Sequence, residues 1–281
     1  MNDLSLSAVA AKHLLTRLNN GVLTITMNRP DKLNGWTLDT MQAFGEAFTK
    51  ANNNDAVKAV ILTGSGQYYS AGANLGGSIK LMHPKKLHQF IEENNYALFD
   101  AYLNCSKPLL IAVNGPAIGA SVTSASLANG IIASQNATFS TPFAALGITP
   151  EGCSSIHFPK IMGEQNAQRM LGEEGWQPTA EQALEIGLVQ WVVPDDQLMA
   201  EAEKIASQWV ANGEQRQFLG GSQLAELKAA NACESTQLAD AFFGTAFLKG
   251  QGRFLWGKNK HAPAAMFYGL LALRPLWKRL L

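Results

Sequence analysis

The stretch Lys107–Ala120, KPLLIAVNGPAIGA, decides the fold. Its first half, Leu109–Val113, is a short, continuous apolar run, which is typical of a strand buried on both faces of a parallel sheet. The second half enters a turn of small residues, Asn114–Ser121, which we expect to open a helix. Small residues after a strand leave backbone N–H groups uncovered, so such a turn can bind an anionic oxygen. The sequence thus predicts a buried strand that ends in a candidate oxyanion site.

A second strand and turn of the same kind lie upstream. The run Val57–Thr63, VKAVILT, predicts another buried strand, and Ser70–Leu75, SAGANL, follows it after a short link. Neither turn matches GxGxxG or GxxxxGK[ST], which argues against a dinucleotide or P-loop site. A lone turn of small residues most often reflects tight packing, but two N–H groups aimed at one point bind an oxyanion.

The remaining pattern alternates strands with helices. The Asn-Gly turn at Asn19–Gly21 predicts a hairpin, and Thr37 is a candidate cap for a helix to Lys50. Further strands are expected at Leu14–Leu18, Val22–Met27, Gly130–Ser134, Ala137–Thr141 and Val189–Val193. Further helices are expected at Pro84–Leu103, Ile118–Leu127, Ser154–Leu171 and, after a capping box at Thr179, Ala183–Ile186. Only helices are expected after Asp195, so the fold class is α/β with an appended helical region.

Composition excludes several classes of protein. The 281 residues suffice for one or two domains, and 22 basic residues balance 22 acidic ones. A neutral chain has no overall field that attracts nucleic acid or anionic lipid. The three cysteines and five histidines show no disulfide or metal-ligand spacing, so no metal site is expected. The apolar stretch 108–127 is interrupted by polar residues, so no membrane span is expected, and in the absence of targeting signals we expect a cytoplasmic protein.

One carboxylate stands out in the string Thr141–Ser155, TPFAALGITPEGCSS. Glu151 lies between Pro150 and Gly152, directly before an expected helix. The helix N-terminus favours the ionised form of such a side chain, whereas apolar burial raises its pKa. A glutamate at this place is most often a helix cap, and only the order of the surrounding sequence elements suggests a catalytic role for it.

The order of these elements resembles the crotonase superfamily, the enoyl-CoA hydratase/isomerase family. The matching segments, which span Leu18–Val193, are Met27–Asn34, Val57–Leu75, Lys107–Ala120, Phe139–Gly163 and Thr179–Val193. The resemblance implies a spiral of ββα units at 1–200 and a helical trimerisation region at 201–281, hence a homotrimer or hexamer. It also implies an acyl-CoA substrate whose thioester oxygen is held by the N–H groups of Ala71 and Ala120. No cofactor is expected, because coenzyme A is part of the substrate.

The resemblance also implies a set of substrate-binding residues. These are Lys32, Leu33, Ala71, Gly72, Ala73, Asn74, Leu75, Gly119, Ala120 and Phe143. Two positions depart from the pattern of the hydratases in this family, which carry glutamates where this chain has Thr123 and Phe143. Asn74 also replaces a common aspartate. Because water addition needs an acid and a base, ordinary hydratase chemistry is not expected.

The subclass is indicated by Thr149–Ser155 and Phe158–Met162, which are similar to peroxisomal-type Δ3,Δ2-enoyl-CoA isomerases. That similarity implies that Glu151 is the catalytic base and that the protein acts in β-oxidation of unsaturated fatty acids. The alternatives are another acyl-CoA reaction, such as hydration or thioester hydrolysis, and a non-catalytic acyl-CoA binder. A serine-protease relative using Ser121 or Ser124 is disfavoured, because no motif places a histidine as its base.

Overall fold

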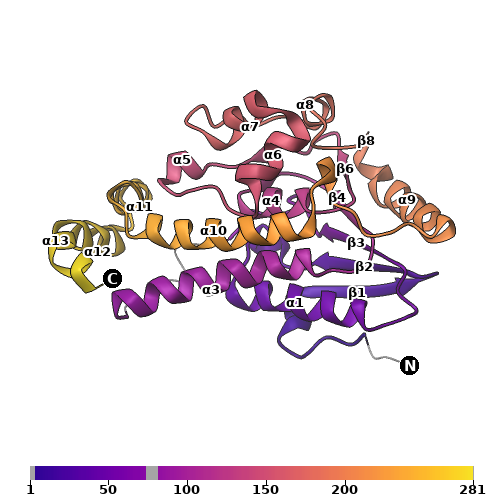
Figure 1. Ribbon diagram of the computed structural model, residues 1–281, viewed down its shortest axis with the longest axis horizontal. Helices are drawn as coiled ribbons and strands as arrows, with labels where there is room; N and C mark the ends of the chain where they lie inside the picture. The colour runs from indigo at the N-terminus through magenta and orange to yellow at the C-terminus, as the bar shows by residue number, and fades with distance from the viewer. Residues whose placement is uncertain (1–3, 74–81, 281) are drawn as a thin grey trace.

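The computed structural model describes residues 4–73 and 82–280 and places a six-stranded sheet at its centre (Figure 1). The strand order is β1-β2-β3-β4-β6-β8; β1 and β2 form an antiparallel hairpin and each later neighbour is parallel. The strands are β1 (Leu14–Asn19), β2 (Val22–Met27), β3 (Ala59–Gly64), β4 (Leu109–Val113), β6 (Gly130–Ser134) and β8 (Trp191–Val193). A two-stranded parallel sheet joins β5 (Ala117–Ile118) to β7 (Phe139–Ser140).

These strands confirm the predicted α/β class and its sheet elements. The hairpin turns at Asn20 and Gly21, which have positive φ values of 47° and 84°. The strands β4 and β6 are buried at every position, as continuous apolar runs predict.

Helices surround the sheet. They are α1 (Leu38–Asn52), α3 (Pro84–Leu103), α4 (Ala120–Ser126), α5 (Phe143–Leu146), α6 (Ser154–Met162), α7 (Glu164–Leu171), α8 (Ala180–Glu185), α9 (Leu198–Asn212), α10 (Leu224–Phe242), α11 (Thr245–Gly257), α12 (His261–Ala272) and α13 (Arg274–Trp277). The single helix expected at Ser154–Leu171 was wrong, because Gly163 has a φ of 79° and separates α6 from α7. The helix expected from Ile118 begins later, at Ala120, since Ile118 pairs with Ser140 in the small sheet.

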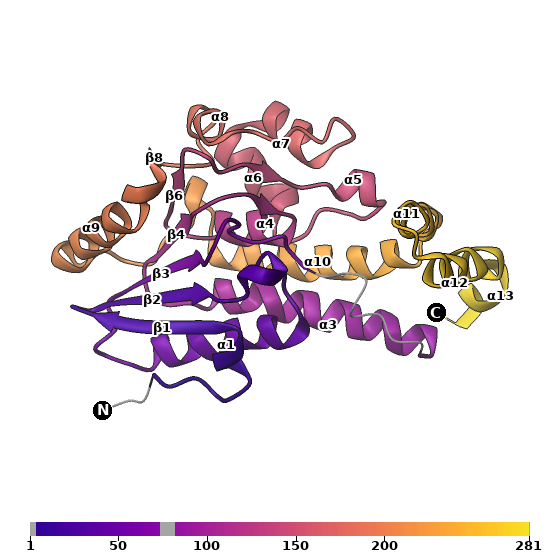
Figure 2. The ribbon, with the colours of Figure 1, turned by 180° about the vertical axis from the view of Figure 1, so that it is seen from behind.

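The two faces of the sheet bury alternate residues of each strand. Val60 and Leu62 of β3 join the main core with the aromatic side chains of α1 and α3, whereas Ala59 and Ile61 pack against α9. The boundary expected at residue 200 falls inside α9, whose Ala202 contacts the sheet. In both views α10 runs beside α3, and α11 to α13 lie beyond their ends, away from the sheet (Figures 1 and 2).

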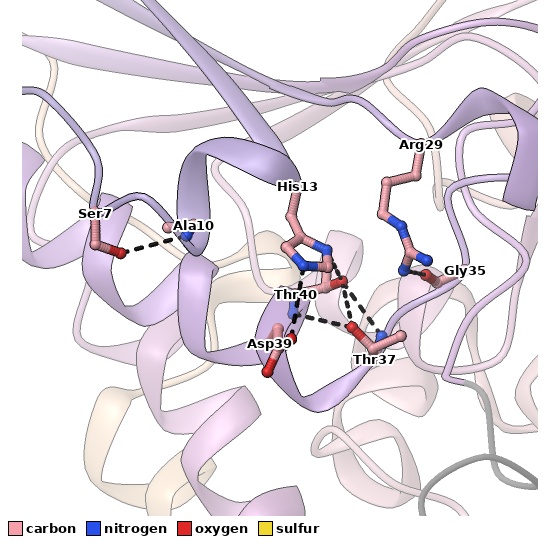
Figure 3. Close-up of polar contacts among 8 residues, drawn as sticks. All are labelled: Ser7, Ala10, His13, Arg29, Gly35, Thr37, Asp39 and Thr40. Carbon is pink, nitrogen blue, oxygen red and sulfur yellow. Dashed lines mark hydrogen bonds and ion pairs between the residues drawn. The ribbon is translucent and has the colours of Figure 1, made fainter.

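The start of α1 is fixed by the capping box that Thr37 makes. The N–H of Thr40 donates to Thr37 Oγ1 at 3.3 Å, and Thr40 Oγ1 also lies 2.8 Å from His13 Nδ1 (Figure 3). Arg29 donates to the carbonyl of Gly35 at 3.3 Å. These contacts hold the loop between β2 and α1, which carries Lys32 and Leu33. Within the described ranges, no helix is both long and apolar enough to cross a bilayer.

Candidate active site

The two small-residue turns lie against each other. The N–H of Ile118 donates to the carbonyl of Ser70 at 3.0 Å, and the N–H of Ser70 donates to the carbonyl of Pro116 at 3.3 Å. Gly72 has a φ of 76°, and a Cβ at this residue would lie 2.3 Å from the Ile118 carbonyl oxygen. Only glycine therefore permits this approach, and the chain brings the ends of two separate segments to one place.

A pocket opens where the turns meet. Its lining residues, all small or apolar except one, are Ala71, Gly72, Ala73, Ile118, Gly119, Ala120, Pro142, Phe143, Leu146, Ile148 and Glu151. Glu151 is the sole ionisable side chain among the described residues of this lining. The pocket thus combines uncharged walls, two backbone turns and one carboxyl group, which is a setting suited to proton transfer.

Two backbone N–H groups of the turns in this lining have no hydrogen-bond partner among the described residues: those of Ala120 and Ala73. Ala120 is the first residue of α4, so its N–H has no carbonyl partner within the helix. Ala73 forms an isolated parallel bridge with Trp36, in which the Trp36 N–H donates to the carbonyl of Gly72 at 2.8 Å. In such a parallel bridge Trp36 bonds to Gly72 and not to Ala73 itself, so the N–H of Ala73 points away from Trp36.

The prediction for Ala71 was wrong. Its N–H donates to the carbonyl of Leu33 at 2.9 Å, so this group is already occupied and is not an oxyanion donor in the structure. The hydrogen bond instead fixes the turn against the Lys32–Leu33 loop, where Leu33 has a φ of 51°. Ala71 still lines the pocket.

Glu151 sits in the loop between α5 and α6 and is only 8% exposed. The next residue, Gly152, has a φ of 70°, and a Cβ there would lie 2.4 Å from Phe99 Cε1. The same Cβ would lie 2.7 Å from Thr123 Oγ1, so the backbone beside Glu151 packs tightly on α3 and α4. Burial, and then the nearby charge of Glu234, raise the pKa of Glu151 to about 8.

No carboxylate occupies the two positions at which the resembling hydratases carry glutamates. The Thr123 hydroxyl is buried and donates to the carbonyl of Ala120 at 3.3 Å. Phe143 is buried and contributes an apolar wall of the pocket, as a predicted lining residue.

The other predicted residues divide into three groups. Gly72, Ala73, Gly119 and Ala120 line the pocket with Glu151. Lys32 and Leu33 do not line it; both are exposed in the loop after β2. Asn74 and Leu75 lie outside the described residues.

Several lining residues were not predicted. Ile118, Pro142, Leu146 and Ile148 belong to the quoted strings, but nothing in their apolar character marks them as pocket residues rather than core. Glu234, on α10 beside Glu151, was missed because it lies far along the chain in a region without a motif.

Comparisons with known proteins agree with this architecture. The family model described as enoyl-CoA hydratase/isomerase matches residues 17–243. Human enoyl-CoA delta isomerase 2 is 38% identical over 192 residues, 67% of this chain and 48% of the human protein. An uncharacterized protein of Caenorhabditis elegans is 37% identical over 201 residues, 70% of this chain and 75% of its own length. This chain therefore spans only about half of the human relative.

Solved structures share the fold. The crystal structure of an enoyl-CoA hydratase/isomerase from Pseudoalteromonas atlantica superposes with a TM-score of 0.76 and 29% identity, covering 87% of this chain and 97% of that one. A likeness over that share of both chains extends to the sheet and to the helices around it. The chain belongs to the enoyl-CoA hydratase/isomerase family.

Proposed function

We propose that the protein is a Δ3,Δ2-enoyl-CoA isomerase, which moves the double bond of a 3-enoyl-CoA into conjugation with the thioester. The observation that carries the proposal is that Glu151 is the sole ionisable side chain among the described residues of the pocket lining. A 1,3-proton shift needs one group that alternates as base and acid, whereas water addition needs a base and an acid around the water. The human relative is itself named an enoyl-CoA delta isomerase.

The reaction begins when the Glu151 carboxylate removes a proton from carbon 2. The electron pair of that C–H bond moves toward the thioester carbonyl and leaves the negative charge of a dienolate on its oxygen. The N–H groups of Ala73 and Ala120 are the donors available for that oxygen. Each such donor is typically worth ~10²–10³ in rate.

The second step returns the proton. Glu151, now a carboxylic acid, gives it to carbon 4, the double bond forms between carbons 2 and 3, and the carbonyl is restored. The pocket walls help because they are apolar: they exclude the water that would otherwise protonate the dienolate or add to the product. The scheme needs no metal and no redox cofactor.

The protonation state of Glu151 sets the pH range in which this side chain can act as the base. With a pKa of about 8, only about a tenth of the free protein holds the carboxylate at pH 7. The raised pKa makes the Glu151 carboxylate a stronger base than an ordinary one, and because this pKa lies close to the working pH the carboxylic acid can also return its proton, as a shuttle requires.

The test compares products from two substrates. Wild-type protein is given a 3-enoyl-CoA, and absorbance follows the conjugated 2-enoyl thioester; separately it is given a 2-enoyl-CoA. The proposal predicts conjugation of the first and neither hydroxyacyl-CoA nor free CoA from the second. Hydroxyacyl-CoA would establish a hydratase, free CoA would establish a thioester hydrolase, and tight binding without turnover would establish an acyl-CoA binder.

We also propose that the chain assembles as a homo-oligomer, a trimer or hexamer, through the helices at its end. Large apolar side chains are exposed there: Phe254 and Trp256 on α11, Leu273 after α12 and Leu276 on α13. Exposed apolar side chains on three successive helices support an interaction surface at this end of the chain. Light scattering should give a trimer or hexamer mass for wild type and a smaller mass for Leu276→Glu; a monomeric wild type would overturn this part.

A further inference from the structure

A second buried carboxylate lies behind the pocket. Glu234, on α10, is 2% exposed, although glutamate side chains are seldom fully buried. Its Oε2 accepts a hydrogen bond from the Cys153 N–H at 2.6 Å. Its Oε1 accepts from the Ser155 N–H at 2.9 Å and from the Ser155 hydroxyl at 2.5 Å.

These bonds tie α10 to the turn that carries Glu151. Cys153 and Ser155 lie at the start of α6, two and four residues after Glu151, and the N-terminal N–H groups of a helix have no partners within it. Cys153 itself has a φ of 65° and no side-chain cap. Glu234 therefore supplies from another helix the cap that the sequence of α6 lacks.

No cation among the described residues neutralises the pair of glutamates. The pKa of Glu151 responds to burial and to Glu234 alone, and that of Glu234 to burial and to its hydrogen bonds with Cys153 and Ser155. The ion pairs of the packed helices lie away from the two glutamates. On α6 and α10 Lys160 binds Glu226, between α10 and α3 Lys228 faces Asp100, and His88 contacts Asp240 and Glu92.

We propose that Glu234 is a positioning residue for the isomerisation: its carboxylate anchors the turn that carries Glu151 and keeps a second negative charge beside it. This inference rests on the proposed function for the identity of the reaction. It also gives α10, in the region expected only to mediate oligomerisation, a part in the active site.

Burial raises the pKa of both glutamates, and hydrogen bonding decides which of the two is ionised more readily. Glu234 accepts three hydrogen bonds that favour its ionised form, whereas the structure gives the Glu151 side chain none within the described residues. Glu151, which lines the pocket, is consequently the more readily protonated of the two. The negative charge of ionised Glu234 makes Glu151 more basic, as like charges do.

The main variant is Glu234→Gln, with Glu226→Gln as its matched control. The glutamine in the main variant keeps the size of the side chain and one acceptor for Ser155, but it removes the charge and the acceptor for Cys153. Glu226 lies on the same helix and also binds α6, through Lys160 at 2.5 Å, but on the exposed surface. Circular dichroism and thermal melts establish that each variant is folded.

Two readouts are measured against pH: kcat/KM for a 3-enoyl-CoA, and the carboxyl ¹³C signals of protein labelled at glutamate. The Glu151 signal is the one that disappears in Glu151→Gln. We expect Glu234→Gln to lower the midpoint of both curves by about one pH unit, because a like charge has been removed. Glu226→Gln should leave both midpoints in place.

An unchanged midpoint in folded Glu234→Gln would overturn the proposal, whatever happens to the rate. If that variant does not fold, the titration of wild-type protein tests the proposal. The Glu151 signal must then have a higher midpoint than the signal of every other glutamate. A Glu151 midpoint below that of another glutamate would overturn the proposal. The NMR readout needs no turnover. A shifted Glu151 signal in a protein without isomerase activity would therefore refute the proposed function but would still establish that Glu234 sets the proton affinity of Glu151.

Discussion

Glu151→Gln should make the protein more stable than wild type at alkaline pH, and the gain should depend on pH in a defined way. The pKa of Glu151 rises to about 8 in the fold from 4.5, the value of a free glutamate side chain. Between these two pH values the folded protein keeps a proton that the unfolded chain has released. The contribution of this proton to stability therefore falls as pH rises through the window, and Glu151→Gln lacks that contribution.

The magnitude follows from the same two values. Each pH unit inside the window is worth about 1.4 kcal/mol of unfolding free energy, so wild type should lose about 2–3 kcal/mol relative to Glu151→Gln between about pH 5.5 and 7.5. Above about pH 8 both states have lost the proton and the difference should level off. All other titrating groups are present in both proteins and largely cancel.

The assay is urea unfolding of both proteins at pH 5.5, 6.5, 7.5 and 8.5. Equal slopes against urea would show that the same surface is exposed in each case. A stability difference that stays constant across this range would refute the reasoning, because it would mean that Glu151 titrates in the fold much as it does in water.

Three further predictions concern the same site. Because the carboxylate form starts the reaction, kcat/KM should rise about tenfold from pH 6 to pH 7 and level off above pH 8; a flat profile would exclude Glu151 as the base. Gly152→Ala should cost about 2–4 kcal/mol in urea unfolding, from its positive φ and the clash with Phe99. An unchanged free energy would contradict that packing. Ala120→Pro should lower kcat by at least ~10² without unfolding the protein, since proline is tolerated at the first helical position; full activity would exclude this N–H as a donor.

The sheet was predictable because each buried strand is a short run of mostly apolar residues, and such a run indicates burial without knowledge of the rest of the chain. The runs Leu109–Val113 and Gly130–Ser134 appear in the structure with the bounds expected from sequence. The break in the helix at Gly163 was harder to predict, because a glycine inside an apolar pattern is compatible with both a helix and a turn.

The site was predictable only as far as local sequence reaches. Small residues after strands marked the two turns, and the context of Glu151 marked the carboxylate. Which N–H of the first turn is unpaired was not predictable, because it depends on the bond from Ala71 to the distant Leu33 carbonyl. Glu234 was missed for the same reason. Its hydrogen bonds to Cys153 and Ser155 form only in the folded chain, and nothing near Glu234 in the sequence indicates them.

The most direct test of the central claim uses a 3-enoyl-CoA carrying deuterium at carbon 2. If Glu151 moves the proton, wild-type protein should form the conjugated 2-enoyl-CoA with part of the deuterium at carbon 4, and Glu151→Gln should form it at least ~10² more slowly. Conversion by Glu151→Gln at the wild-type rate would contradict the account.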